Sequence, residues 1–529
     1  MHDSCTFPLA RGLSVRVFPR LLAALVVATS LSGCVNLPPL ENRSVSTAIT
    51  DTARTTLGRA VAPLVALHPA KSGIYTLRDA RIAFDARVVL TQSAQRTLDV
   101  QYYIWRNDMT GGLLFEGLRD AADRGVRVRL LLDDNNTSGL DPVLAALDAH
   151  PNIEVRLFNP FAIRSWRWLG YLTDFSRLNR RMHSKSFTAD NQVTIIGGRN
   201  IGDAYFGATN DVLFADLDVM AIGPVVAGVS AEFDRYWASD SSYPVQGLLT
   251  PVTDVQSANL RLAAMAMENS PPAKAYIRAV KESSFERELL QGALPFEWAE
   301  TQIVSDNPDK GLGKATPEGQ FTDKLKRAIG EPKDEVDLVS PYFVPTASGV
   351  DSLAGMVRRG VKINVLTNAF EATDVAVVHA GYAKRRKALL SAGITLYELK
   401  RLAQIPAARR SGSSLGDSTS GSSLHAKTFA VDRERVFIGS FNFDPRSARL
   451  NTELGFVIES PALAQQIDDA FKNRVPLNAY EAKLAEDGRV YWLEHKEGAL
   501  IRHDIEPGTT LWQRFGMYLM SLLPIEWLL

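Results

Sequence analysis

The chain has 529 residues, more than one ordinary domain, and its composition is that of a folded globular protein. Lys plus Arg equals Asp plus Glu at 59 each, so bulk charge gives no drive towards nucleic acid. Cys5 and Cys34 are the only cysteines, and no His-Glu-Xaa-Xaa-His pattern occurs. We therefore expect no structural disulfide, no metal site and no cofactor.

The first 34 residues are typical of an export signal. Three arginines precede an apolar run at 21–29 that is too short to span a bilayer. Leu31-Ser-Gly-Cys34 resembles a bacterial lipobox, in which cleavage leaves a lipidated cysteine, although an ordinary cleaved signal would look similar. We favour lipidation of Cys34, which predicts a lipoprotein in the bacterial cell envelope, facing the periplasm. Val35 in place of Asp favours the outer membrane.

Helices and strands alternate from Ala80 onward, which predicts an α/β fold with mostly parallel sheets covered on both faces. The first set comprises helices at 81–94, 111–124 and 141–149 and strands at 97–104, 126–132 and 153–158. The same order returns with strands at 335–342, 361–367 and 394–399 and helices at 349–359 and 375–392.

Two local matches indicate that the chain contains an internal duplication. Residues 123–131 (DRGVRVRLL) parallel 358–366 (RRGVKINVL), and 224–237 parallels 461–474. The predicted division is a signal peptide at 1–33, a tether at 34–79, a first half at 80–245, a connecting segment at 246–330, a second half at 331–478 and a C-terminal segment at 479–529. The apolar end of that last segment either rests on a membrane surface or docks on the protein as a helix.

One chemical pattern occurs twice with identical spacing, once in each predicted half. The first copy is His183-Ser-Lys185-Ser-Phe-Thr-Ala-Asp190 followed by Gly197-Gly198-Arg-Asn200. The second copy is His425-Ala-Lys427-Thr-Phe-Ala-Val-Asp432 followed by Gly439-Ser440-Phe-Asn442. A single His-x-Lys-x4-Asp would be a weak signal, whereas two copies at equivalent places in a repeat are specific.

The spacing has a physical meaning, because residues i and i+2 of a strand share a face and each histidine then points the same way as its lysine. The aspartates begin turns, and the small residues at 197–198 and 439–440 are expected to let the backbone approach a phosphate. Two facing sets would supply two histidines, two cations and two amide donors. Metal-free phosphoryl transfer requires such positioning and electrostatic stabilisation.

These paired motifs resemble those of the phospholipase D superfamily over roughly residues 80 to 475, and 197–200 with 451–456 resemble bacterial cardiolipin synthases of the type C branch. The resemblance implies two homologous phospholipase D-like α-β-α halves packed around one shared active site. It also implies a phosphohistidine intermediate, with His183 as the preferred nucleophile and His425 as acid and base. The phosphoryl oxygens would be held by Lys185, Lys427, Asn200 and Asn442.

The family also places a carboxylate behind each histidine to orient the ring. Glu453 fits this role by motif, and Asp216 fits it by register with Glu453, while Asp218 is the competing choice. Asp190 and Asp432 are assigned a structural role at their turns.

The resemblance favours a phosphatidyltransferase acting on phospholipids at a membrane surface, which would make cardiolipin from phosphatidylglycerol and a second phospholipid. A hydrolytic phospholipase D with water as acceptor is the first alternative. An exported nuclease of the same superfamily is the second, and the neutral charge with an envelope signal argues against a nucleic-acid partner.

Overall fold

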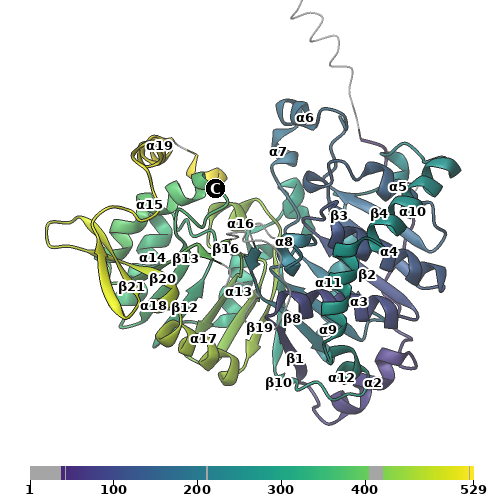
Figure 1. The fold of residues 1–529 in the computed structure, drawn as a ribbon, viewed down its shortest axis with the longest axis horizontal. Coiled ribbons are helices and arrows are strands. Elements are labelled where there is room, and N and C mark those ends of the chain that lie inside the picture. The colour runs from purple at the N-terminus through teal and green to yellow at the C-terminus, as the bar shows by residue number, and fades with distance from the viewer. Residues whose placement is uncertain (1–36, 42, 210–212, 404–420, 524) are drawn as a thin grey trace, which may run out of the picture.

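The computed structural model describes residues 37–41, 43–209, 213–403, 421–523 and 525–529. The predicted signal peptide and Cys34 lie outside these residues. Two α/β halves lie side by side, each built on one large sheet (Figure 1). This arrangement confirms the predicted α/β class and the two homologous halves, but not the predicted strand directions.

The sheet of the first half has nine strands in the order β10-β1-β8-β6-β5-β2-β3-β4-β9. These strands are β1 Ser72–Leu77, β2 Thr97–Tyr102, β3 Arg127–Asp133, β4 Ile153–Phe158, β5 Ser186–Ala189, β6 Val193–Gly197, β8 Asp218–Ile222, β9 Ser242–Pro244 and β10 Glu297–Ala299. Only the β2–β3 and β3–β4 pairs of this sheet are parallel.

The sheet of the second half has ten strands in the order β11-β19-β18-β17-β12-β13-β14-β20-β21-β22. These strands are β11 Thr301–Ser305, β12 Glu335–Val339, β13 Lys362–Asn368, β14 Thr395–Leu399, β17 Thr428–Val431, β18 Arg435–Gly439, β19 Leu454–Glu459, β20 Ala479–Leu484, β21 Val490–Lys496 and β22 Ala499–His503. A small third sheet joins the halves, since β7 Leu213–Ala215 pairs with β16 Gly421–Leu424, which also pairs with β15 Leu402–Ala403.

The expectation of mostly parallel sheets is wrong, because both large sheets are mixed. In the second half, too, only two pairs are parallel, β12–β13 and β13–β14. Helical crossovers connect these three strands, whereas each motif folds as an antiparallel hairpin, β5–β6 or β17–β18, beside them. The alternation of helices and strands in the sequence predicts the helical crossovers, but it does not predict the direction of the hairpin strands that pair beside them.

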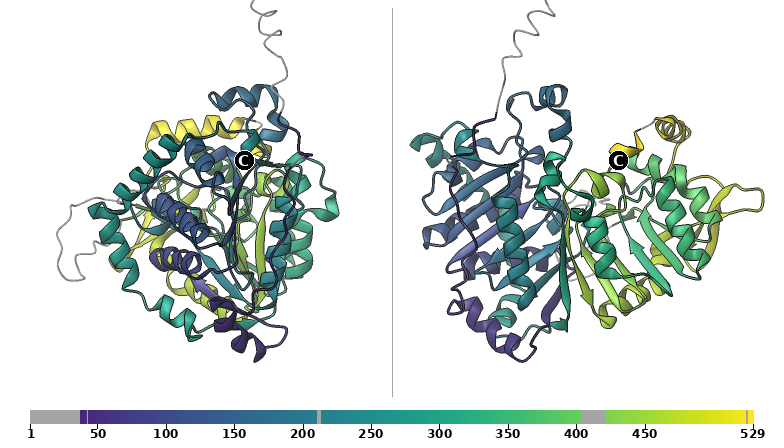
Figure 2. Two further views of the ribbon diagram at one scale, coloured as in Figure 1. Left: turned by 90° about the vertical axis from the view of Figure 1, so that its right-hand side faces the viewer. Right: turned by 180° about the vertical axis from the view of Figure 1, so that it is seen from behind.

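Helices cover both sheets (Figure 2). The helices that precede β10 in the chain are α2 Thr56–Ala66, α3 Ala80–Ser93, α4 Met109–Asp123, α5 Asp141–Asp148, α6 Arg167–Thr173, α7 Phe175–Leu178, α8 Asp203–Phe206, α9 Pro224–Trp237, α10 Asp254–Glu268, α11 Pro271–Lys281 and α12 Phe285–Leu290. The helices that follow β11 are α13 Phe321–Ile329, α14 Ala347–Arg358, α15 Ala376–Ser391, α16 Pro445–Arg449, α17 Pro461–Asn473, α18 Val475–Asn478 and α19 Leu511–Leu522. The helix α16 starts with an Asp444 N-cap and Pro445 at the first helical position.

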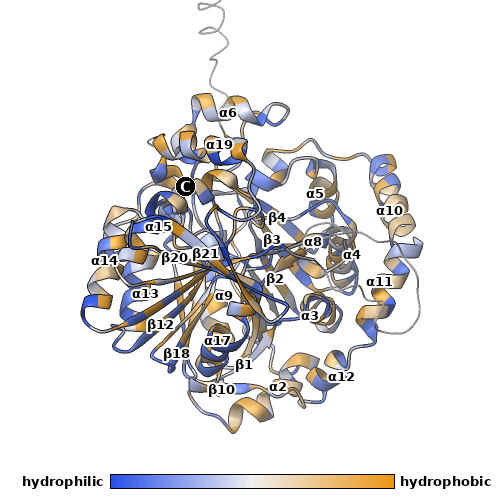
Figure 3. Cartoon of the chain, turned by 60° about the vertical axis from the view of Figure 1, so that its left-hand side comes forward, coloured by the Kyte–Doolittle hydropathy of each residue, from blue (hydrophilic) through white to orange (hydrophobic). Residues whose placement is uncertain are grey.

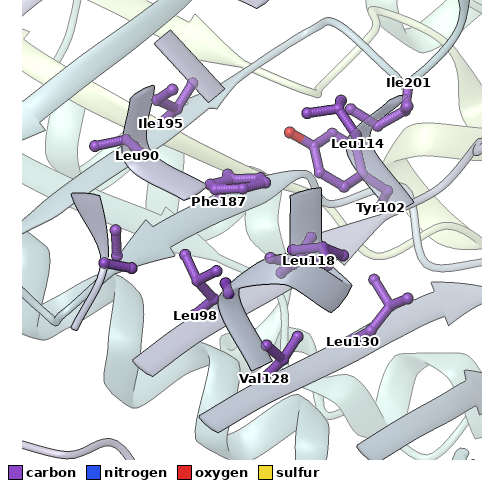
Figure 4. Close-up of a cluster of buried hydrophobic side chains, with 14 of the residues drawn as sticks. Leu90, Leu98, Tyr102, Leu114, Leu118, Val128, Leu130, Phe187, Ile195 and Ile201 are labelled. Carbon is purple, nitrogen blue, oxygen red and sulfur yellow. The ribbon is translucent and has the colours of Figure 1, made fainter. Parts of the chain in front are cut away.

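The core of the first half lies between its helices and the central strands. Figure 4 shows side chains of α3 and α4 packed over β2, β3, β5 and β6, among them Leu90, Leu118, Leu98, Val128 and Phe187. Another buried apolar cluster contains residues of both halves, with Ile196 and Val219 beside Ile438, Leu454 and Phe456. The halves therefore share a buried interface, and the two motif hairpins border it.

The predicted connecting segment contributes to both sheets. Its strand β10 completes the first sheet and β11 begins the second, so the chain changes sheets at Glu300. The predicted C-terminal segment adds β20, β21 and β22 to the second sheet, and α19 packs against α15. In the described part of the chain, no helix combines the length and the apolar character needed to cross a membrane.

Candidate active site

Each motif histidine lies three residues before a central strand, β5 or β17, and is fixed by the opposite half. The histidines and lysines therefore precede these strands, and the expectation that strand geometry aligns each pair is wrong. The backbone N–H of His183 donates to the carbonyl of Thr452 at 2.9 Å, and that of His425 donates to Ala215 at 2.8 Å. Both residues are buried, at 6% exposure. The two motifs, which are 242 residues apart in the sequence (425 − 183), therefore meet at the interface between the halves.

The carboxylates behind the histidines are exchanged between the halves. Nδ1 of His183 lies 2.9 Å from Oε2 of Glu453, and Nδ1 of His425 lies 2.5 Å from Oδ2 of Asp216. A hydrogen bond from Nδ1–H to each carboxylate fixes the tautomer and leaves Nε2 free to react. The structure thus places both predicted carboxylates where an orienting role requires them.

Asp218, the competing choice, has a different environment. Its carboxylate accepts from the buried Arg87 at 2.7 Å and from the backbone N–H of Arg199 at 3.0 Å. A buried carboxylate with these partners holds α3 against the sheet and leaves the ring of His425 to Asp216.

The small residues of the motifs also have a packing role, beside the approach to phosphate that the sequence predicts. A Cβ atom on Gly198 would overlap the carboxylate of Asp216, and one on Gly439 would overlap the backbone of the neighbouring strand β19. At the position equivalent to Gly198, the hydroxyl of Ser440 donates to Oε2 of Glu453. Gly198 and Ser440 thus leave room for the carboxylates behind the histidines, and Gly439 lets β19 approach closely, while the expected approach to a phosphate stays a prediction.

The two lysines lie beside the histidines and are buried with them. Nζ of Lys185 donates to the carbonyl of His183, and Nζ of Lys427 donates to the carbonyl of His425. Burial lowers the pKa of both amines, to about 7 for Lys185. The carboxylates of Glu453 and Asp216 oppose this shift and favour the charged amines, so the site can hold two cations beside the histidines, as an anion-binding site requires.

The electrostatics of the histidines differ between the halves. Burial, with Lys185, Lys427 and His425 nearby, holds the pKa of His183 well below its usual value. Burial and Lys427 also lower the pKa of His425, but Asp216 opposes this shift. The two carboxylates shift in opposite directions. Burial opposes ionisation of Asp216, but the nearby His425 and Lys427 outweigh burial and lower the pKa of Asp216. Burial raises the pKa of Glu453 to about 7. Both rings therefore favour the neutral form, and the carboxylate of Asp216 makes His425 the easier of the two to protonate.

The two motif asparagines differ in their hydrogen bonds. The side chain of Asn200 already bonds other residues of the protein. Nδ2 of Asn200 donates to the hydroxyl of Tyr205 at 3.1 Å, and its Oδ1 accepts from the N–H of Ile104 at 3.2 Å. Asn442 is buried, and its Oδ1 has no hydrogen-bond partner. An unpaired buried amide oxygen is a group that a bound ligand can satisfy.

The motif aspartates fill the structural role expected of them. The carboxylate of Asp190 accepts from the backbone N–H groups of three consecutive residues, 95–97, and that of Asp432 accepts from 333–335. Both residues have positive φ, as does the residue after each, which is the geometry of a type I′ hairpin turn. Each aspartate therefore ties its hairpin to the start of the neighbouring central strand.

Aromatic rings that carry no motif signal form walls of the site. Tyr103 packs edge-on against His183 at 4.9 Å between ring centroids, and Tyr205 packs in the same way against His425 at 5.3 Å. Phe214 also contacts His425, at 5.1 Å, and together with Tyr205 lines a cavity of about 410 Å³. The only sequence signals for these tyrosines are that Tyr103 directly follows the strand β2 and that Tyr205 lies five residues after Asn200.

One acidic cluster outside the site has a geometry that could hold a metal ion. Ligand atoms of Glu335, Asp337 and Asp468 lie within 4.8 Å of one another in the described part of the chain. However, Glu335 and Asp468 bind cationic side chains of the protein, including Lys362 and Arg433. The cluster is therefore accounted for by ion pairing and takes no part in the site.

Two homologous halves that bring together paired histidines, lysines and exchanged carboxylates define a phosphodiesterase site of the phospholipase D type. A family model described as "Cardiolipin synthase, PLD-like domain" matches residues 89–237 and 325–475, and the chain belongs to this family of phosphatidyltransferases. Cardiolipin synthase C of Escherichia coli K12 is 52% identical over 477 residues, covering 89% of this chain and 99% of the relative.

More distant proteins share the same architecture. A cardiolipin synthase of Staphylococcus aureus is 23% identical over 426 residues, covering 80% of this chain and 71% of the relative. The crystal structure of phosphatidylserine synthase from Haemophilus influenzae superposes with a TM-score of 0.55 at 12% identity and covers 89% of this chain and all of that one. At this identity the match supports the fold alone.

Proposed function

We propose that the protein is a cardiolipin synthase that transfers a phosphatidyl group from one phospholipid to the glycerol headgroup of phosphatidylglycerol. The observation that carries the proposal is the pair of buried histidines, each oriented by a carboxylate of the opposite half. The similarity to cardiolipin synthase C over nearly its whole length favours lipid substrates and a membrane-associated enzyme.

The reaction proceeds in two balanced steps. Nε2 of His183 attacks phosphorus, a P–N bond forms, and the P–O bond to the leaving alcohol breaks as His425 gives that oxygen its proton. In the second step the acceptor hydroxyl returns a proton to His425, its oxygen forms the new P–O bond, and the P–N bond breaks. The low pKa of His183 supports its role as nucleophile, and the short contact to Asp216 supports His425 as the ring that takes up and releases the proton.

Lys185 and Lys427 neutralise the phosphoryl oxygens in this scheme, with the amide of Asn442 as a further contact. Two buried cations from the protein supply the charge stabilisation that a phosphoryl transfer state needs. We therefore expect chelators to leave turnover unchanged.

The lipid anchor at Cys34 remains a proposal from the sequence, since that residue lies outside the described part of the chain. It would hold the protein in the bacterial envelope, on the periplasmic face, with the outer membrane favoured. Metabolic labelling with a fatty-acid analogue tests it: label in the wild type and none in Cys34→Ser supports the anchor, and label in both variants contradicts it.

The test of function is lipid mass spectrometry on phosphatidylglycerol vesicles, with and without phosphatidylethanolamine. We expect cardiolipin from the wild type and a loss of roughly a thousandfold or more in His183→Ala and in His425→Ala. His379→Ala is a matched control, because this buried histidine bonds Glu506 away from the motifs. Full activity in either motif variant would contradict the two-histidine mechanism.

The same experiment separates the alternatives. Phosphatidic acid as the sole product would identify a hydrolytic phospholipase D. Cleavage of DNA with strong salt dependence, and no lipid product, would identify a nuclease.

A further inference from the structure

Large apolar side chains are exposed together at one place in the first half. Trp166, Trp168, Leu172 and Phe175, in and beside α6 and α7, are 45–74% exposed and form what we call the first platform. Single exposed apolar residues are ordinary on protein surfaces, whereas a group with two tryptophans marks an interaction site.

A second group lies in the other half, on α19 and the short helix η6 Glu526–Leu528. The second platform consists of Leu511, Trp512, Phe515, Leu519, Leu522 and Trp527, which are 48–77% exposed. The opposite side of α19 packs on α15 and buries Met517, so the helix is held with its apolar stripe outward. All four tryptophans exposed by a third or more belong to the two platforms.

Both platforms project from the same end of the molecule. Figure 1 and both views of Figure 2 place α6 and α19 at this end, one on each half. Figure 3 shows orange, apolar segments on both helices at that end. Cys34, the proposed lipidation site, lies only three residues before Leu37 in the sequence.

Arg446 connects both platforms to the active site. This residue of α16, four positions after Asn442, donates to the carbonyl of Asn179 after α7 and to that of Leu528 in η6, each at 3.0 Å. The segments that carry the platforms therefore meet directly beside the second motif.

We propose that the two platforms together form one bilayer-docking surface, which inserts its aromatic side chains into the interfacial layer of a phospholipid membrane and presents the site between the halves to the lipid headgroups. This deepens the proposed function, on which the choice of a lipid bilayer as the occupant rests. Tryptophan and tyrosine favour the level of the headgroups, and an apolar helical face buries itself there.

The charges near the first platform indicate that apolar insertion carries the binding. Arg164 pairs with Asp134 and Asp141, and Arg177 pairs with Asp174, so these arginines are neutralised within the protein. Binding should therefore change little when salt is raised from about 0.1 M to about 1 M, because screening weakens only the electrostatic part.

The test is flotation with vesicles of phosphatidylcholine or phosphatidylglycerol, using the unacylated mature chain from Cys34, which contains every described element. We expect Trp166→Ala/Trp168→Ala and Trp512→Ala/Phe515→Ala each to bind both vesicles roughly tenfold or more weakly. Leu477→Ala/Leu500→Ala is the matched control, since these residues are 60% and 57% exposed on α18 and β22, away from both platforms.

Turnover distinguishes this surface from the proposed function. The double variants should keep wild-type turnover on a short-chain phosphatidylglycerol that stays dispersed as monomers, and should lose it on vesicles. A wild type inactive on both substrates would refute the proposed function and leave the binding result intact. Unchanged binding in both platform variants, binding abolished by salt, or a dimer that the variants dissociate would each overturn the docking surface.

Discussion

At the scale of single residues, the site depends on what lies behind its histidines. The sequence identified Glu453 by motif and Asp216 by register, because a duplicated chain supplies its own alignment. The choice of Asp216 over Asp218 needed the structure, since both residues lie in one short stretch and only contacts show which reaches His425. Tyr103 and Tyr205 were not foreseen, because neither has a counterpart in a motif.

The pKa values predict a bell-shaped dependence of turnover on pH with its maximum near neutrality. Glu453, whose pKa burial raises to about 7, must be ionised to hold His183, so activity falls as pH drops through this value. Lys185, whose pKa burial lowers to about 7, must be protonated to neutralise phosphate, so activity also falls as pH rises. Lys185→Arg should move the alkaline limb upward while retaining the acid limb. A profile identical to that of the wild type would contradict the role of Lys185.

Gly198→Ala should reduce turnover by about a hundredfold or more, because its methyl group would displace Asp216 from His425. Gly355→Ala in α14 is the control, since its Cβ would make only ordinary contacts. Steady-state kinetics, with circular dichroism to verify folding, makes the comparison. A fully active and folded Gly198→Ala would show that the carboxylate of Asp216 tolerates a methyl group at this position, and would contradict the prediction.

At the scale of elements, the sequence predicted the parallel strands of both halves and the helices that connect them, but gave no ranges for β8 and β19, which pair with the motif hairpins. It misjudged the sheets as mostly parallel, because hydrophobic periodicity identifies a strand without stating the direction of its neighbour. The strands β20, β21 and β22 were also missed, since an apolar C-terminal end drew the interpretation towards a membrane segment. That end proves to be a helix docked on α15 that still exposes an apolar stripe.

Asp190→Ala should lower the free energy of unfolding by about 2 to 4 kcal/mol, because three backbone N–H groups at the start of β2 lose their acceptor. Urea denaturation measures the change, and Asp504→Ala, at an exposed ion pair, should stay within about 0.5 kcal/mol of the wild type. Folded Asp190→Ala should keep most of its turnover. Unaltered stability would mean that water replaces the carboxylate.

At the scale of the whole molecule, the exchange of carboxylates makes the two halves one catalytic unit. No motif search reveals this exchange, because each repeat contains a histidine and a carboxylate that look like partners within one half. The pairing across the interface follows from the way the halves pack, which long-range contacts such as His183 to Thr452 fix.

The exchange predicts that each carboxylate variant slows the step of the histidine in the other half. With an aryl phosphodiester, whose leaving group needs no proton, Asp216→Asn should accumulate the phosphohistidine at His183, because only the base step by His425 is impaired. Glu453→Gln should form that intermediate slowly and accumulate none. Acid-quenched peptide mass spectrometry measures both, and the reverse pattern would interchange the roles of the histidines.

The exchange also sets when the protein can first become active. A ribosome makes the chain from its N-terminus, so His183 emerges 270 residues before the carboxylate that orients it. The first half can fold around its own core long before then, but it holds an unoriented imidazole and lacks His425. The enzyme is thus silent throughout its synthesis and gains its reactivity only when the second half has joined the first.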